Sequence, residues 1–429
     1  MNNGKGLGAF VVISKKGDPK GESLVIKTRD MSDYQLPPVW TKLKRHDVFP
    51  EFSHDERARY NFLSNLNRFV STVIAPGNKI AFDRRVQPKF QQEKGRDFAD
   101  RHELQDYMSK DPVYQCWAAL RRCTMEMRQQ NGRAVVLRQA KELAEKVRKT
   151  LNGNGNLQLK EDFKVPPYLL HVDNHLMPGS YHTEYFKGDV SNAANYDSGL
   201  FVTSGGMLGS LTDGGGQAIA KWVRETYPDF KPKRILDIGC GLGHNALPIA
   251  QAYPEAEVVA IDAGAPMLRY GAARAKALGV HNVTFIQADA ASMPEFADGS
   301  FDWVQTTMFL HETGGKSIHT IMREINRVLK PGGLTLHIEQ PQYTPEMSLY
   351  EQFMRDWDAF YNAEPYWGHM HDLQPSDLME EAGVPKEKFM QVGVKAVNDL
   401  DRKKQDGKVT EDYGRSPIWN VFGGWKKSA

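Results

Sequence analysis

Three aspartates and a glycine turn are the residues of this 429-residue chain whose types and spacing most clearly suggest chemistry. Glycines let a backbone turn tightly and approach a ligand, whereas a carboxylate can accept hydrogen bonds from ribose hydroxyls or from the exocyclic amine of a purine. The third glycine of a nicotinamide-binding fingerprint is absent, because His244 stands at that position. The set that predicts a nucleoside-like ligand is Asp237, Gly239, Gly241, Gly243, Asp262 and Asp289.

A parallel sheet is the element that must bring these residues together. From Gln217 onward, apolar runs typical of strands alternate with stretches of helical period, namely RILDIG, EVVAID and VTFIQAD between helices. Such alternation predicts an α/β fold with helices on both faces of the sheet. Because the carboxyl ends of parallel strands meet at one edge, we expect the three aspartates to share that edge.

The combined motifs resemble the class I S-adenosylmethionine-dependent methyltransferases. They comprise the DxGxGxG array of 237–243, the two later strand-end aspartates, FDWVQTTMFLHE (301–312) and VLKPGGLTLHIE (328–339). The chain looks most like the small-molecule branch with type 11/25-like domains, which includes the ubiquinone and menaquinone C-methyltransferases. The resemblance implies a Rossmann-like seven-stranded sheet, S-adenosyl-L-methionine as cofactor, and a small, aromatic or apolar acceptor.

The resemblance also implies roles for single residues. The glycine turn would lie against the methionine and ribose portions of the cofactor, and Asp237 would orient its ammonium group. Asp262 would hold the ribose hydroxyls, while Asp289 and the backbone of Ala290 would bind the adenine. Met267 would pack on the adenine face, although plain core filling accounts for a methionine there equally well.

Two titratable residues, His311 and Glu312, follow the fourth strand of the domain at the same sheet edge. A sulfonium is an activated methyl donor, so the protein has to align the acceptor and handle its proton. We predict His311 as the general base. The alternatives are that His311 hydrogen-bonds backbone in its loop and that Glu312 caps the next helix.

An aromatic segment, residues 343–372, lies between the fifth strand and the last helix. We expect it to cover the acceptor pocket, with Tyr361, Trp367, His369 and His371 binding the acceptor. An aromatic stripe at helical spacing equally suits a core. The HxH pair at 369 and 371 suggests a metal, but the sequence offers no third ligand beside it, so we predict no metal site.

Residues 181–199 form a second candidate cover, and Tyr196 is its predicted acceptor-binding residue. Glycines at 199, 205, 206 and 209 would allow such a loop to move. An ordinary connection between domains would have the same composition.

The chain divides into three predicted regions: 1–156, a hairpin (AFVVIS and SLVIKT) plus a mostly helical part; 157–216, a connecting or lid segment; and 217–429, the methyltransferase domain. Ser53 and Glu56 have the spacing of a capping box at a helix start. Residues 1–150 contain 29 Lys and Arg against 18 Asp and Glu, opposite in sign to the rest. This charge difference predicts docking within the chain or a homodimer formed through the N-terminal region.

Composition excludes several classes of protein. Lys and Arg number 55 against 53 Asp and Glu, and no uncharged apolar run approaches the ~20 residues of a membrane span. The N-terminus lacks the features of a secretory signal, so we expect a cytoplasmic protein without membrane partners. Three cysteines without CxxC spacing disfavour disulfides and structural zinc.

Two other functions use the same motifs. A nucleic-acid (RNA) methyltransferase would use the basic N-terminal region, but the segment TTMFLHE carries neither an NPPY-like box nor a Pro-Cys nucleophile. A non-catalytic S-adenosylmethionine-binding scaffold would keep the acidic array without turnover. The sequence thus favours methyl transfer to a small molecule and disfavours a nucleic-acid partner.

Overall fold

The computed structural model of the protein describes residues 36–153, 155–400 and 418–428. By their contacts, the described residues from Pro38 onward form one compact unit. The predicted hairpin of AFVVIS and SLVIKT lies outside the described residues. The region boundaries at 156 and 216 stay a prediction.

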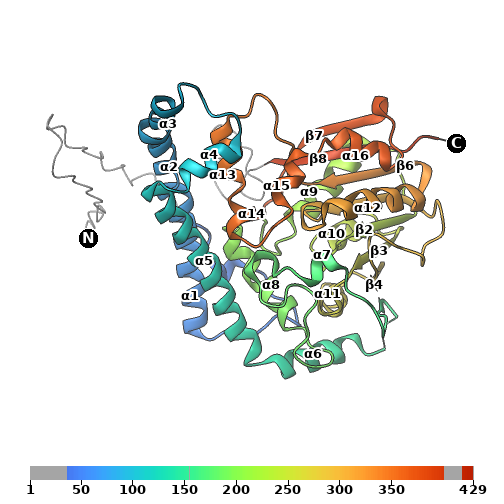
Figure 1. Cartoon of the computed structure of the whole chain (residues 1–429). Coiled ribbons are helices and arrows are strands. Elements are labelled where there is room, and N and C mark those ends of the chain that lie inside the picture. Colours follow the sequence, from blue (N-terminus) through green and yellow to red (C-terminus); the bar gives the residue numbers. More distant parts are fainter. Residues whose placement is uncertain (1–35, 154, 401–417, 429) are drawn as a thin grey trace, which may run out of the picture. The chain divides into compact units, whose positions relative to one another are not determined.

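An eight-stranded sheet of order β1-β4-β3-β2-β5-β6-β8-β7 carries the C-terminal half (Figure 1). The strands β1 to β6 run parallel, and β8 pairs antiparallel with both β6 and β7. The seven strands β4, β3, β2, β5, β6, β8 and β7 form the seven-stranded sheet that the resemblance implies, and β8 and β7 close it as an antiparallel pair. Strand β1, two residues long, is an eighth strand that we did not predict. The bounds are β1 Leu157–Gln158, β2 Arg234–Ile238, β3 Glu257–Asp262, β4 Val283–Gln287, β5 Phe301–Thr307, β6 Leu329–Ile338, β7 Phe389–Lys395 and β8 Ile418–Trp425.

Apolar layers cover both faces of the sheet because successive side chains of a strand point to opposite faces. In β2, Ile235 packs in one core with helices α9, α10 and α11, whereas Leu236 and Ile238 pack in the other with α12 and α16. These helices are α9 Gly214–Thr226, α10 Ala246–Ala252, α11 Ala265–Ala277, α12 Gly315–Val328 and α16 Pro375–Glu381. The short η6 spans Lys386–Lys388.

The N-terminal part of the described chain is helical, as predicted. Its first long helix, α1, has a complete capping box: Ser53 Oγ accepts from the Glu56 amide, and Glu56 Oε2 accepts from the Ser53 amide at 2.7 Å. Figure 1 shows α1 beside the long helix α5. The elements are η1 Trp40–Lys42, α1 His54–Phe69, η2 Val70–Ile74, α2 Pro76–Ala81, η3 Phe82–Val86, α3 Gln87–Lys94, α4 Arg101–Met108, α5 Pro112–Leu137 and α6 Ala140–Leu151.

Short helices fill the segments that we expected to cover the site. The candidate lid of 181–199 runs into α8, a mostly buried helix, so its second half is regular structure rather than loop. The aromatic segment forms three helices, of which the first two pack through Phe353 and Trp357 on α5. The elements are α7 Pro167–Leu170, η4 Asn174–Leu176, α8 Ser191–Thr203, η5 Leu310–Glu312, α13 Leu349–Arg355, α14 Trp357–Tyr361 and α15 Trp367–Asp372.

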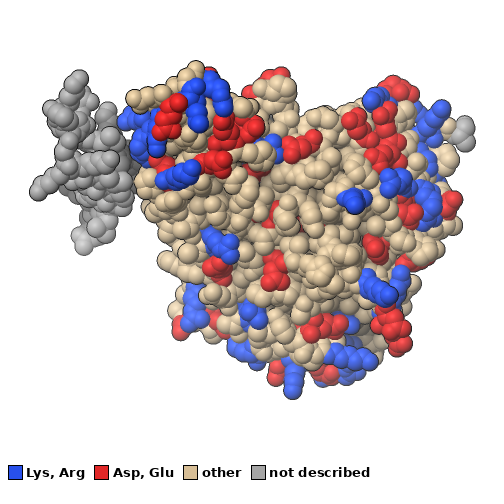
Figure 2. Space-filling model, viewed as in Figure 1, with Lys and Arg blue, Asp and Glu red and all other residues tan. Residues whose placement is uncertain are grey.

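Charged side chains of both signs are interspersed on the face that Figure 2 shows, including the part over α3 and α4. Arg96 there pairs with Glu103, and Lys79 with Asp83. No helix in the described part of the chain is long and apolar enough to cross a bilayer.

Candidate functional site

A cavity of about 820 Å³ opens where β2, β3 and β5 end. Its wall combines the predicted sheet edge with residues of α5, α8 and the helices of the aromatic segment. Nine of the predicted site residues line it: Gly239, Gly241, Asp262, Met267, Ala290, His311, Glu312, Tyr196 and Trp367. The other six do not line it: Asp237, Gly243, Asp289, Tyr361, His369 and His371.

Asp262, at the end of β3, holds the glycine turn in place. Its carboxylate accepts from the Gly241 amide at 2.9 Å and from the Gly264 amide at 2.8 Å. Burial raises its pKa to about 6, although both amide hydrogen bonds oppose that shift. Each carboxylate oxygen keeps a lone pair with which a ribose hydroxyl could bond.

The two cavity-facing glycines of the turn have different reasons for lacking a side chain. Both have left-handed φ, 69° at Gly239 and 52° at Gly241. A Cβ at Gly239 would strike the Phe309 ring at 2.2 Å, so packing requires that glycine. A Cβ at Gly241 would meet no atom within 4 Å, so this backbone is left open to a ligand. The space beside Gly241 fits the predicted nucleoside.

The predicted cofactor residues outside the lining support the cavity from behind. Asp237 is buried and accepts from Gln305 at 2.9 Å, and burial raises its pKa to about 7. Gly243 packs against Phe285 of β4. Asp289 is half-buried and accepts from the Ala291 amide at 2.9 Å.

His311 lies between two glutamates. Its Nδ1 is 2.6 Å from Glu339 Oε1, and its Nε2 is 3.5 Å from Glu364 Oε2. Burial by itself would lower the pKa of His311, but the charge and hydrogen bond of Glu339 raise it to about 9. The imidazole is therefore a cation at neutral pH, which argues against its predicted use as a general base.

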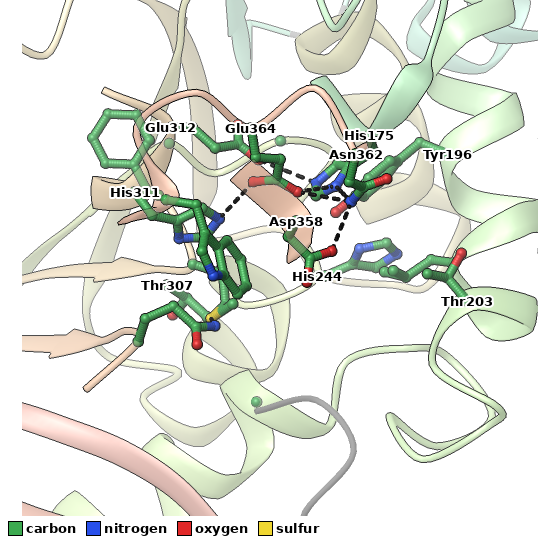
Figure 3. A pocket seen from close by; sticks show the side chains of 18 of the residues that line it. His175, Tyr196, Thr203, His244, Thr307, His311, Glu312, Asp358, Asn362 and Glu364 are labelled. Carbon is green, nitrogen blue, oxygen red and sulfur yellow. Dashed lines mark hydrogen bonds and ion pairs between the residues drawn. The ribbon is translucent and has the colours of Figure 1, made fainter. Parts of the chain in front are cut away.

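His175 continues this row of charges (Figure 3). Its Nδ1 is 2.6 Å from Glu364 Oε1, and its Nε2 is 3.2 Å from Glu312 Oε1. Burial opposes protonation, yet the two glutamates raise the pKa of His175 well above its usual value. We call the set Glu339, His311, Glu364, His175 and Glu312 the carboxylate–imidazole chain.

Sequence reasoning did not find His175 or Glu364. They come from η4 and from the loop before α15, far from each other and from η5 along the chain. His175 has a left-handed φ of 56°, which is uncommon for a residue with a side chain. That conformation gives no sequence signal comparable to a glycine.

His175, Glu312 and Glu364 each offer one atom within 4.8 Å of the others, a spacing compatible with a metal ion. However, both ring nitrogens of His175 face carboxylates, and a metal ligand needs a nitrogen lone pair directed at the ion. The arrangement therefore favours a bridging imidazolium over a metal centre.

The predicted acceptor-binding residues separate into two groups. Tyr196 and Trp367 line the cavity, and the Trp367 ring stands edge-on to His311 with centroids 4.9 Å apart. Tyr361 packs on Trp357 in the helical core. His369 is exposed. Buried His371 donates from Nδ1 to the Pro341 carbonyl, and burial lowers its pKa to about 3.

A second buried cluster forms around Asp197 of α8. His46 Nε2 lies 2.9 Å from Oδ2, His244 Nε2 lies 3.2 Å from Oδ1, and Tyr270 donates to Oδ2 at 2.8 Å. Arg274 Nε is 3.8 Å from Oδ1. Asp197 does not line the cavity, whereas His244 does, so this cluster fixes the glycine turn to α8 and α11.

Comparison with known proteins agrees with this geometry. Residues 235–333 match the family model described as methyltransferase domain. The chain is 37% identical over 128 residues to a demethylmenaquinone methyltransferase of Geobacillus stearothermophilus, covering 29% of this chain and 53% of that protein. It is 40% identical over 110 residues to the demethylmenaquinone methyltransferase of Thermus thermophilus, covering 26% and 48%. The chain thus spans about half the length of the curated relatives it matches.

Among solved structures, the crystal structure of the YcgJ protein from Bacillus subtilis aligns with 49% of this chain and 98% of that chain, at 21% identity and a TM-score of 0.34. The matched family model covers the glycine turn, Asp262 and Asp289, and these residues lie at strand ends of the sheet whose order is β1-β4-β3-β2-β5-β6-β8-β7. On these grounds residues 235–333 form a methyltransferase domain of the class I, S-adenosylmethionine-dependent type.

Proposed function

We propose that this protein transfers the methyl group of S-adenosylmethionine to a small-molecule acceptor and releases S-adenosylhomocysteine. The observation that carries the proposal is a single cavity that joins the open backbone at Gly241 to the carboxylate–imidazole chain. A nucleoside at the glycine turn and an acceptor at the carboxylate–imidazole chain would therefore share one cavity. Holding both reactants in one cavity lets orientation contribute to the rate.

The methyl donor would be held by Asp262 at its ribose hydroxyls and by the turn of 239–243 along its methionine portion. Met267 is fully buried, and with Ala290 it lines the part of the cavity between β3 and β4 where the adenine would lie. Asp237 and Asp289 would act from behind this lining, as support for the turn and for the backbone of Ala290. When bound, the donor supplies an electrophilic methyl carbon.

Glu312 is the better candidate for handling an acceptor proton. It lines the cavity and accepts from Tyr181 at 2.9 Å and from Asn174 at 3.0 Å. Burial opposes ionisation, but His175 lowers the pKa of Glu312, so it is a carboxylate at neutral pH. His311 would instead stabilise Glu364 and Glu339 as a fixed cation.

Binding of S-adenosylhomocysteine, measured by calorimetry on the full chain, tests the proposal. Gly241→Ala places a methyl group where the ligand would lie and should weaken binding about tenfold or more. Gly95→Ala is the matched control, because Gly95 has a φ of 69°, has no atom near its Cβ position and ends α3. Equal affinities in the two variants would contradict the site.

Methyl transfer from labelled donor, assayed against pooled small metabolites and against RNA, tests the acceptor class. Label in the RNA fraction alone would favour the basic N-terminal region as the acceptor surface. Binding of the donor without transfer to either pool would favour a scaffold. The predicted homodimer and cytoplasmic location are separate predictions that this assay does not address.

A further inference from the structure

The carboxylate–imidazole chain contains more negative than positive charge. Three carboxylates, Glu312, Glu339 and Glu364, alternate with two imidazoles. Even with both imidazoles protonated, one negative charge is left over. Glu339, His311 and Glu364 are buried, and Glu312 and His175 are partly buried, with 14% and 27% of the side chain exposed. An uncompensated charge is expensive to bury.

Other cations on the cavity wall do not compensate this excess. Arg121 is 3.0 Å from Asp358, and Arg355 is 3.8 Å from Glu351, so each guanidinium has its own carboxylate. His244 does not help either, because burial lowers its pKa and its Nε2 already faces Asp197 and Thr212.

Two buried oxygen atoms, one in the carboxylate–imidazole chain and one beside it, have no hydrogen-bond donor within the described residues. Glu364 Oε2 accepts no hydrogen bond, and its one close cation is His311 at 3.5 Å. The amide oxygen of Asn362, whose nitrogen donates to Glu364 Oε1 at 3.1 Å, has no donor either. Both side chains line the cavity, and Figure 3 shows them pointing toward each other and toward His175. They are acceptors available to a ligand that carries N–H groups.

Aromatic side chains enclose the same place. Tyr181 bonds to Glu312, stands edge-on to Tyr196 with ring centroids 5.6 Å apart, and lines the cavity with it. Trp367 stands edge-on to His311 and also lines the cavity. Aromatic rings attract cations, and next to carboxylates they form a setting that suits an organic ammonium group.

We propose that the acceptor is a basic amine whose nitrogen binds between Glu312 and Glu364 and is the atom that is methylated. This inference rests on the proposed methyl transfer and specifies its substrate class. An anionic acceptor would meet the excess carboxylate, and like charges repel strongly at low dielectric. A metal ion would need a ring nitrogen of His175, and both ring nitrogens face glutamates.

The chemical step balances with these groups alone. A primary or secondary amine that arrives as an ammonium ion passes one proton to Glu312, the carboxylate proposed above to handle the acceptor proton. Glu364 Oε2, which accepts no hydrogen bond within the described residues, accepts one from a remaining N–H. The nitrogen lone pair then forms the bond to the methyl carbon, while the electron pair of the carbon–sulfur bond stays on sulfur. The positive charge moves from sulfur to nitrogen. The protonated carboxylate then releases its proton to solvent, which restores the excess negative charge beside the new ammonium ion.

Calorimetry on the full chain saturated with S-adenosylhomocysteine tests the inference. Phenethylamine and tryptamine are the probes, and 3-phenylpropionate and indole-3-propionate are anions of matched size. We expect the amines to bind at least tenfold more tightly than the anions. Glu364→Gln should weaken amine binding tenfold or more and leave S-adenosylhomocysteine affinity within about twofold.

The control variant is Glu381→Gln, which removes a carboxylate from a histidine pair outside the cavity, with His319 Nδ1 2.6 Å away. It should keep wild-type amine affinity. If Glu364→Gln does not fold, Glu312→Gln provides the same comparison.

Three results would overturn the inference: amines that bind no better than their anions, amine affinity unchanged in the glutamate variants, or stoichiometric binding of Mn²⁺ alone that Glu364→Gln abolishes. A protein that does not bind S-adenosylhomocysteine would instead refute the methyltransferase proposal itself.

Discussion

Two clusters of histidines and carboxylates lie at or beside the cavity, and they differ in the ratio of basic side chains to carboxylates. Asp197 is one carboxylate that meets two histidines, a tyrosine and, at 3.8 Å, an arginine. The carboxylate–imidazole chain has three carboxylates for two histidines. The first has more basic side chains than carboxylates, and the second has more carboxylates than basic side chains.

This difference distinguishes a structural cluster from a reactive one although the residue types are the same. At Asp197, burial opposes ionisation, but the hydrogen bonds from His244 and His46 keep the pKa well below its usual value. Its lone pairs are used within the protein. In the carboxylate–imidazole chain, by contrast, negative charge and lone pairs remain for a ligand. Four of its five residues line the cavity, whereas Asp197 does not. Each prediction below tests one side of this comparison.

Asp197→Ala should have the largest effect on stability. Removal of this carboxylate leaves buried His46, His244 and Arg274 without their common partner. We expect the free energy of unfolding to fall by about 3 to 5 kcal/mol, measured by urea denaturation near neutral pH. Glu364→Gln, in the carboxylate–imidazole chain, should lower the free energy of unfolding clearly less. Similar losses in the two variants would remove the distinction between the clusters.

His311 should make stability depend on pH in the alkaline range. Its pKa is about 9 in the folded protein and about 6.5 in an unfolded chain. The raised pKa means that protonated His311 stabilises the folded protein. Its contribution to the free energy of unfolding, at most roughly 3 kcal/mol, is fully present below pH 6.5 and is lost as pH rises toward 9. Unfolding curves of wild type and His311→Gln between pH 6 and 9.5 measure the difference. If His311→Gln had the same slope, the imidazolium assignment would be wrong.

Asp262→Ala should act on cofactor binding instead. Loss of charge-assisted hydrogen bonds to the ribose costs roughly 1.5 to 3 kcal/mol, a rise of about ten- to hundredfold in the Kd for S-adenosylhomocysteine. Asp298→Ala is the control, since Asp298 is exposed and pairs with Arg327 away from the cavity.

The pH dependence of this affinity adds a second test. Burial and the nearby Glu312 raise the pKa of Asp262 to about 6, so a wild-type carboxyl is protonated increasingly below that pH. Affinity should therefore decline from pH 7 to 5 in wild type and stay flat in Asp262→Ala. A decline of equal size in the variant would assign the titration to another group.

Much of the fold could be predicted because it depends on local pattern. Buried strands such as RILDIG and EVVAID are short apolar runs, and the glycine turn is required by positive φ and close approach. The parallel sheet and the residues Gly239, Gly241 and Asp262 at the cavity follow from them. Strand β1, two residues in a glycine- and asparagine-rich segment, has too little periodicity to be recognised.

The acceptor side of the site could not be predicted because it depends on distant parts of the chain. His175, Glu312 and Glu364 come from three separate segments, and their charges have meaning only in contact. The prediction that His369 and His371 bind the acceptor failed to place them at the cavity for the same reason. They are two residues apart in the sequence, yet His369 is exposed and His371 is buried against Pro341.

A histidine–carboxylate pair at the surface should have the smallest effect, and it completes the comparison. His319 Nδ1 lies 2.6 Å from Glu381 Oε1, a distance equal to that between His311 and Glu339. The surface side chains are about one-third exposed, so water and salt screen the pair. Glu381→Gln should therefore change the free energy of unfolding by about 0 to 1 kcal/mol, and less at high salt. A loss as large as that of Asp197→Ala would mean that distance, and not burial with its count of donors and acceptors, determines what such pairs contribute.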